Sequence, residues 1–239
     1  MTFAVARPKP GWLLDETASA GDENLDPAHV ARYDTKEDAG AAAEVELLRG
    51  RGLDVSSVVV DLGAGTGQFT LAVAPACARV VAVDVSLVML DRLRANVADS
   101  PFCNVEVVRA GFLTYHHAAA PADVIYTRYA LHHLPDAWKA VALARMRRML
   151  RTGGLVRLWD VVYNFAPAEA EDRLEAWCAT GGDGIVGEWG RAELEDHIRD
   201  EHSTFTWLME PMIERAGFQI EQAVYSDDGI YAQYLLRTA

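Results

Sequence analysis

Short apolar runs alternate with amphipathic segments between residues 56 and 163. Five of the runs predict strands: SSVVVDLG, RVVAVDVS, NVEVVRAGF, ADVIYTRY and GGLVRLWDVVY. The segments between them predict helices, the longest in DAWKAVALARMRRML. Strands that are apolar along their whole length and alternate with helices are typical of a parallel sheet covered on both faces. The pattern therefore predicts an α/β fold with a doubly wound sheet and helices on both faces.

The C-terminal part of the chain departs from this alternation. Residues 164–210 have a helical pattern around a glycine-rich stretch, GGDGIVGEWG. Two alternating runs follow in residues 214–237, and the SDDG between them is typical of a hairpin turn. We therefore expect a Rossmann-like, mostly parallel sheet that ends in an antiparallel C-terminal hairpin and carries a helical insertion at about residues 164–210.

The N-terminal residues are mostly polar and precede the first predicted strand. Pro27 directly after Asp26 is typical of the start of a helix, and a helical pattern continues from there to about Arg51. We expect residues 1–45 to form an N-terminal helical lid segment over the edge of the sheet, and residues 46–239 to form the main domain.

Residues 58–70, VVVDLGAGTGQFT, join the first predicted strand to a helix through three glycines at alternate positions. A strand, a glycine-rich turn and a helix N-terminus together form a ligand cradle. The spacing GxGxG differs from the GxGxxG of dinucleotide-binding folds, and no GK[ST] follows, so a phosphate-binding loop is not indicated. Asp61, directly before the glycines, would repel a phosphate but can pair with an ammonium group.

The stretch DLGAGTG resembles the first motif of the class I S-adenosylmethionine-dependent methyltransferases. Asp84 in VVAVDVS matches the family acid that binds both ribose hydroxyls, and Met89 matches the apolar residue that packs on the adenine. The loop AGFLTY at 110–115 matches the loop at the adenine edge, and YTRYALHHLPD and LRTGGLVRL match later family segments. The family often has Asp at the position of Gly111, as acceptor for the adenine amino group. Its absence leaves adenine recognition to the backbone amide of Phe112.

The resemblance implies S-adenosyl-L-methionine as the cofactor and a set of residues that bind it. These are Tyr33, Asp61, Gly63, Ala64, Gly65, Gly67, Asp84, Val85, Met89, Gly111, Phe112 and Thr127. A Cβ at Gly63 or Gly65 would collide with the cofactor or could not adopt the required φ. For Met89 and for Tyr33, packing inside the protein is an equally good interpretation.

Three residues after the fourth predicted strand are candidates for catalysis: Arg128, Tyr129 and His132. They follow the strand where acceptor and cofactor are expected to meet, and a histidine there can handle a proton. One of His132 and His133 can instead be structural, with its ring bonded to the backbone. No Asp or Glu near this pair in the sequence completes a ligand set, so we expect no metal site.

The composition limits the partners of the protein. The chain has 35 acidic residues against 22 Lys and Arg, a formal net charge of −13, which disfavours nucleic acid. No apolar run approaches the roughly 20 residues of a membrane span, and the N-terminus lacks the apolar stretch of a signal peptide. The three cysteines are widely spaced, so we expect reduced thiols and a cytoplasmic protein, monomeric or homodimeric.

These features favour methyl transfer to a small-molecule O, N or C nucleophile. The [DN]PP[YF] motif of enzymes that methylate base or glutamine amino groups is missing from the sequence. An alternative is a protein of the same fold that binds S-adenosylmethionine without transferring its methyl group, for regulation or for other chemistry. A NAD-dependent reductase is disfavoured by the GxGxG spacing and by the lack of a YxxxK pair.

Overall fold

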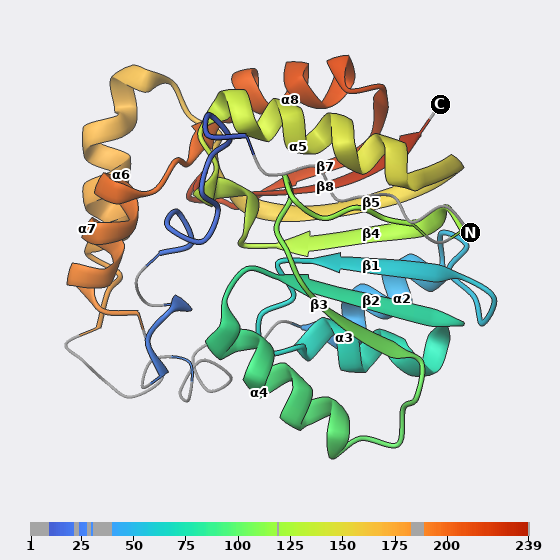
Figure 1. Cartoon of the computed structure of the whole chain (residues 1–239). Coiled ribbons are helices and arrows are strands. Elements are labelled where there is room, and N and C mark those ends of the chain that lie inside the picture. The colour runs from blue at the N-terminus through green and yellow to red at the C-terminus, as the bar shows by residue number, and fades with distance from the viewer. Residues whose placement is uncertain are drawn as a thin grey trace.

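A single mixed sheet forms the centre of the molecule, as a computed structural model describes it for residues 10–21, 24–27, 30, 40–118, 120–182 and 189–238 (Figure 1). The strands are β1 (Val58–Leu62), β2 (Arg79–Asp84), β3 (Val105–Arg109), β4 (Ala122–Arg128), β5 (Leu150–Tyr163), β6 (Thr204–Phe205), β7 (Phe218–Tyr225) and β8 (Tyr231–Thr238). Their order is β3-β2-β1-β4-β5-β8-β7, with β6 paired to β5. The pairs among β1 to β5 are parallel, and β8 is antiparallel to β5 and β7. The predicted sheet and its C-terminal hairpin are confirmed.

Helices cover both faces of this sheet. They are α2 (Ala41–Arg49), α3 (Gln68–Val73), α4 (Leu87–Ala98), α5 (Asp136–Met149), α6 (Ala170–Cys178), α7 (Arg191–Asp200) and α8 (Thr206–Arg215). Short 3₁₀ helices are η2 (Ala74–Ala76), η3 (Leu131–His133) and η4 (Pro167–Glu169). In Figure 1, α5 and α8 lie on one face, whereas α2, α3 and α4 lie on the other. None of the described helices is long and apolar enough to cross a membrane.

The two-sided cover explains why the strand sequences are continuously apolar. Neighbouring residues of β1 point to opposite faces, yet Val59 and Val60 are both fully buried. Val60 belongs to the core cluster that includes Leu143 of α5, and Val59 to the cluster that includes Leu48 of α2 and Phe69 of α3. An alternating polar position would leave an unsatisfied group inside one of these clusters.

Both predicted boundaries lie within helices that pack into the core. The predicted boundary at residue 45 lies inside α2, which packs into the core through Val45 and Leu48. The predicted insertion ends inside α8, whose Met209 and Ile213 belong to the main core, so that α6 and α7 are the helices that stand off the sheet. Residues 10–21 form turns and no helix, and Figure 1 shows them beside the ends to which the arrows of β1 and β4 point.

A buried ion pair ties α2 to the centre of the sheet. Arg157 of β5 donates from Nε to Glu44 Oε2 (2.6 Å) and from Nη2 to Glu44 Oε1 (2.8 Å). Only 3% and 8% of the two side chains are exposed. Gln233 of β8 accepts a further bond from Arg157 Nη2 (2.5 Å). Removing one partner of such a pair is costly because the other charge is left buried.

Glu44→Ala is expected to lower the free energy of unfolding by about 3–5 kcal/mol, because the Arg157 charge then loses its carboxylate. Glu46→Ala is the matched control, since Glu46 lies on the same helix in an exposed ion pair with Arg49 and is worth at most about 1 kcal/mol. Urea denaturation followed by circular dichroism measures both variants. Equal losses would contradict the structural role of the buried pair.

Candidate functional site

The glycine-rich turn after β1 is hydrogen-bonded to the neighbouring strand β2. The backbone N–H groups of Gly63 and Ala64 both donate to the Val83 carbonyl of β2 (2.8 and 3.1 Å). The turn then leads into α3, whose first residue follows Gly67. The predicted strand, turn and helix are therefore present, and the turn lies where the parallel strands β1, β2 and β4 end.

Gly63 and Gly65 lack a side chain for different reasons. Both have positive φ, +75° and +53°, a region that glycine adopts readily. A Cβ on Gly63 would lie 2.3 Å from the Cβ of Ala130, so the contact that excludes it is internal to the protein. A Cβ on Gly65 would meet only Met89 Sδ at 4.0 Å. The open space predicted for a ligand is therefore found at Gly65, and at Gly63 the constraint is packing.

Two buried acids flank this turn. Asp84 Oδ2 accepts from the Gly65 N–H (2.9 Å) and Oδ1 from the Ser86 N–H (2.8 Å), and Asp61 Oδ2 accepts from Thr70 Oγ1 (2.6 Å). Burial raises the pKa of Asp84, although the hydrogen bonds from Ser86 and Gly65 oppose it. Burial likewise raises the pKa of Asp61 to about 7. A ligand that brings hydroxyl or ammonium donors would therefore favour the charged form of both carboxylates.

Two small cavities meet at the turn, and we call them the inner cavities. They share Gly63, Gly65, Arg128 and Tyr129. Predicted cofactor residues that line one of them alone are Asp84, Val85, Met89, Gly111 and Phe112 in the first, and Asp61 and Ala64 in the second. Of the other predicted residues, Gly67 lines neither of them, and Thr127 is fully buried within β4. Tyr33 is outside the described residues.

Arg128 and Tyr129 are held in fixed positions at the end of β4. The Arg128 guanidinium carbon lies 4.1 Å from the centre of the Trp159 ring and 4.7 Å from that of Tyr129, within the range of cation–π attraction. Tyr129 has a φ of +48°, which is uncommon for a residue with a side chain. Its N–H donates to the Trp159 carbonyl (2.9 Å), which helps to hold this conformation.

A carboxylate from the N-terminal segment lies directly beside Gly111. Glu16 Oε1 accepts from the Leu113 N–H (2.9 Å), and Oε2 accepts from Thr114 Oγ1 (2.9 Å). A Cβ built on Gly111 would lie 2.3–2.7 Å from atoms of this carboxylate. Glu16 is 6% exposed and lines the first inner cavity. Sequence reasoning missed it because DETASAGDENLD contains several acids and no feature that distinguishes one of them.

A larger cavity of about 640 Å³, which we call the outer cavity, adjoins the inner ones. Its lining comes from the N-terminal segment, from η3 and from α6 and α7, and includes Ala18, Asn24, Trp177, Leu194, His197, Glu201 and Tyr231. Asn24, Tyr129 and His133 line both this cavity and the first inner cavity. These three residues therefore form the border between the two spaces.

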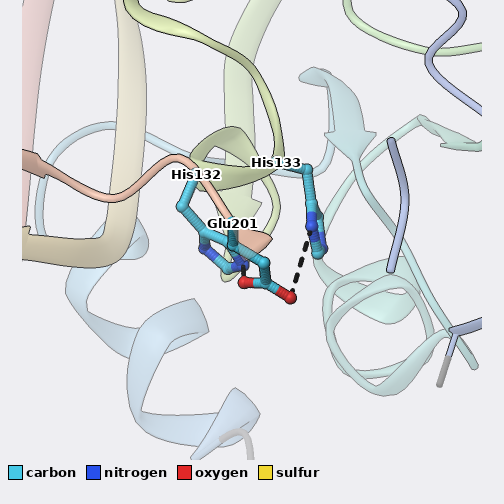
Figure 2. A group of neighbouring side chains, drawn as sticks. All are labelled: His132, His133 and Glu201. Atoms are coloured by element: carbon cyan, nitrogen blue, oxygen red, sulfur yellow. Dashed lines mark ion pairs between the residues drawn. The ribbon is translucent and has the colours of Figure 1, made fainter. Parts of the chain in front are cut away.

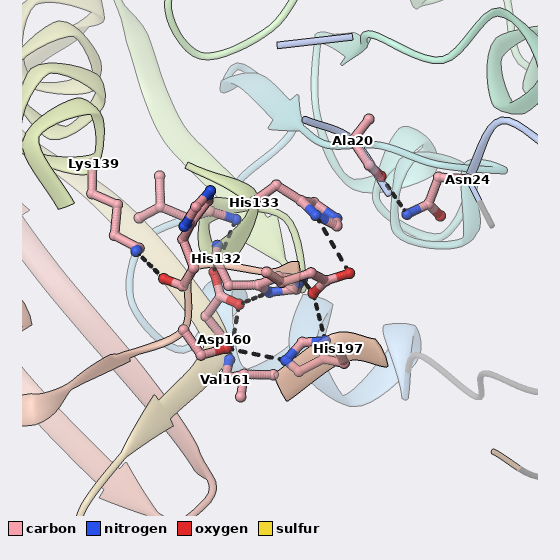
Figure 3. A network of polar contacts seen from close by, with 12 residues as sticks. Ala20, Asn24, His132, His133, Lys139, Asp160, Val161 and His197 are labelled. Atoms are coloured by element: carbon pink, nitrogen blue, oxygen red, sulfur yellow. Dashed lines mark hydrogen bonds and ion pairs between the residues drawn. The ribbon is translucent and has the colours of Figure 1, made fainter. Parts of the chain in front are cut away.

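His132 lies at the centre of a buried polar network (Figure 3). Its Nδ1 is hydrogen-bonded to Asp160 Oδ1, and its Nε2 lies 2.9 Å from Glu201 Oε2. Asp160 also accepts the N–H groups of Leu131 (2.9 Å), His132 (3.1 Å) and Val161 (2.8 Å). Burial alone would lower the pKa of His132, but the Asp160 and Glu201 carboxylates outweigh it and raise this pKa to about 10. Both nitrogens of the predicted proton-handling residue thus face carboxylates.

Comparison with known proteins finds similarity to methyltransferases. Residues 59–154 match the family described as a methyltransferase domain. An uncharacterized methyltransferase of Geobacillus sp. (strain WCH70) is 25% identical over 208 residues, which cover 87% of this chain and 89% of the relative.

Solved structures share the fold. Magnesium protoporphyrin IX methyltransferase from Synechocystis PCC 6803, with bound S-adenosylmethionine, matches with a TM-score of 0.63 at 13% identity, covering 96% of this chain and 100% of that one. The [4+2]-cyclase SpnF matches with a TM-score of 0.62 at 16% identity, covering 82% and 80%. At these identities the likeness establishes the architecture and leaves the substrate open.

Gly65→Asn is expected to weaken binding of S-adenosylhomocysteine at least about tenfold, because asparagine tolerates positive φ but places a side chain in the inner cavities. Gly63→Ala is the comparison: its Cβ would clash with Ala130, so it should instead cost about 1–3 kcal/mol of stability. Titration calorimetry measures the binding and thermal unfolding the stability. A folded Gly65→Asn variant with normal affinity would show that this glycine serves only the turn.

Proposed function

We infer that the chain is a class I S-adenosylmethionine-dependent methyltransferase and that it transfers the methyl group to a small molecule held in the outer cavity. The observation that carries this proposal is the border of Tyr129, His133 and Asn24 between the inner and outer cavities. A methyl donor on one side and an acceptor on the other would meet at these residues. A cavity of about 640 Å³ is in the range typical of small-molecule sites.

The residues of the inner cavities fit S-adenosylmethionine, which is the cofactor of this fold. The open space at Gly65 leaves room for the ligand, and Asp84 beside it can accept from ribose hydroxyls. Asp61 can pair with the ammonium group of the methionine part, and Met89 offers an apolar surface to the adenine. When bound, the cofactor supplies a methyl group already activated on a sulfonium.

The protein's own contribution is then mainly alignment. Holding two reactants in line can contribute about 7–11 kcal/mol to lowering a barrier. Tyr129 is fixed on the border between the inner and outer cavities, so we assign it to positioning the acceptor. Arg128 lines the inner cavities and supports Tyr129 through the cation–π contact. If the acceptor keeps a proton at neutral pH, His132 cannot receive it while the Asp160 and Glu201 carboxylates raise its pKa to about 10, because the ring is then already protonated. Glu201 also lines the outer cavity, but the neighbouring histidines lower its pKa against the effect of burial, which makes it a weak base.

In the family an Asp at the position of Gly111 often accepts a hydrogen bond from the adenine amino group, and here Glu16 would supply that carboxylate. The Glu16 carboxylate caps the loop after β3 through Leu113 and Thr114, as an Asp at position 111 would do from within the loop. We therefore assign Glu16 the role of acceptor for the adenine amino group, with the Phe112 amide beside it.

Methyl transfer is tested by incubating the protein with S-adenosylmethionine and either the low-mass or the macromolecular fraction of a cell extract. S-adenosylhomocysteine is expected to accumulate only with the low-mass fraction, together with a product one methylene heavier than its precursor. Accumulation only with the macromolecular fraction would overturn the small-molecule proposal. Tight cofactor binding without turnover in either fraction would favour the alternative of a non-transferring protein, since the fold also serves a [4+2]-cyclase.

Glu16→Ala is expected to weaken S-adenosylhomocysteine binding about tenfold or more, the equivalent of one charged hydrogen bond of about 1.5–3 kcal/mol. Gly111→Asp in the Glu16→Ala background is expected to restore the affinity, because the new carboxylate enters the space that Glu16 has left. Gly111→Asp alone should bind poorly, since its Cβ would lie 2.3 Å from the Glu16 carboxylate. Calorimetry on the three variants measures this, and failure of the double variant to recover would contradict the assignment.

A further inference from the structure

Two histidines and a glutamate come together in space (Figure 2), and all three line the outer cavity. His132 and His133 lie on η3, and Glu201 directly follows α7, so α5, β5, α6 and α7 separate the acid from the histidines along the sequence. One ligand atom from each residue lies within 4.8 Å of the other two. We propose that His132, His133 and Glu201 bind a divalent transition-metal ion, with Zn²⁺ as the reference ion.

The distances suit a tetrahedral ion. Zinc binds histidine nitrogen and carboxylate oxygen at about 2.0–2.2 Å, so neighbouring donor atoms stand roughly 3.3 Å apart. His132 Nε2 lies 2.9 Å from Glu201 Oε2, and His133 Nδ1 lies 3.7 Å from Glu201 Oε1. The two contacts use different oxygens of Glu201, and a small rotation of its carboxylate would bring both distances to this spacing. Two His and one Glu are also a known catalytic zinc set, in which a fourth position stays open.

One donor atom, His133 Nδ1, is buried and has no hydrogen-bond partner among the described residues. Its distance to Glu201 Oε1 is 3.7 Å, which is too long for a hydrogen bond. Glu201 Oε2 is in ion pairs with His132 Nε2 (2.9 Å) and His197 Nδ1 (2.5 Å), so the carboxylate is already held among imidazole nitrogens. Buried polar atoms without partners are rare in proteins, and a bound ion would satisfy His133 Nδ1.

The surroundings of His132 are those of a metal ligand. Asp160 accepts a hydrogen bond from Nδ1, which fixes the ring and leaves Nε2 facing Glu201. Such a carboxylate behind a ligating histidine is the usual second contact in zinc sites. Asp160 and Glu201 also bring two negative charges, which raise the pKa of the His132 ring between them. A dication bound at Nε2 would take the place of a proton there and balance the pair.

The site faces the space assigned to the acceptor. His132, His133 and Glu201 all line the outer cavity, and His133 also lines the first inner cavity. An ion there would present its open position to an oxygen or nitrogen atom of the acceptor and hold that atom beside the methyl donor. This role rests on the proposed function, whereas the binding of the ion does not.

The experiment is Zn²⁺ titration of the chelator-treated full chain, without cofactor or acceptor. Calorimetry and elemental analysis are expected to give one Zn²⁺ per chain, and Zn²⁺ should raise the thermal unfolding temperature. His133→Ala and Glu201→Gln should each lower the affinity at least about tenfold, and Asp160→Asn about 10–100-fold. Substituting Co²⁺ should give the visible absorption bands of a four-coordinate ion.

The chain provides a matched control in a second adjacent pair, His116 and His117, of which His116 is exposed. His116→Ala should leave Zn²⁺ binding unchanged. The proposal is overturned if the chelator-treated chain without substitutions binds no stoichiometric Zn²⁺, or if His133→Ala, shown by circular dichroism to be folded, binds Zn²⁺ with the original affinity. Either result would leave methyl transfer untouched, because that reaction is measured separately by S-adenosylhomocysteine release.

Discussion

The carboxylate of Asp160 fixes the geometry on which the rest of the site depends. It is 1% exposed, and it accepts the backbone N–H groups of Leu131, His132 and Val161 as well as the His132 ring. These bonds connect β5 to the turn after β4, so that Asp160 and the histidines of η3 lie together at the same edge of the sheet. A buried charge is tolerated here because several donors surround it. The arrangement of Tyr129, His132 and His133 follows from this one anchor.

The position of Asp160 explains why the inner cavities and the outer cavity are adjacent but separate. The turn after β4 supplies Ala130, which closes against Gly63, and also supplies His133, which lies on the border of the outer cavity. A shift of the turn would disturb the cofactor side and the acceptor side together. The site is therefore rigid at its centre, while α6 and α7 and the N-terminal segment provide its outer walls.

The sequence was sufficient for the elements whose signals are local. Strands buried on both faces, the turn at Gly63 to Gly67 and the SDDG hairpin all carry their pattern within a few residues. Contacts between distant segments carried no such pattern. Glu16 meets Leu113 across 97 positions and Glu44 meets Arg157 across 113, and neither acid differs in its local sequence from its neighbours. Glu201 is likewise distant in sequence from His132 and His133, so the sequence did not indicate that it would complete a ligand set with them.

The contact that we propose between Glu16 and the adenine has a thermodynamic consequence for residues 10–21. An acid within the loop would serve the cofactor whether or not residues 10–21 were docked, whereas an acid on the segment serves it only in the docked arrangement. Docking and cofactor binding then become linked equilibria, and each strengthens the other by the same free energy. Occupancy of the inner cavities would thereby affect the wall of the outer one, to which Ala18 and Ser19 of the same segment contribute. With Gly111 in the loop and the acid on a distant segment, cofactor binding would favour the docked arrangement of the residues that line the outer cavity.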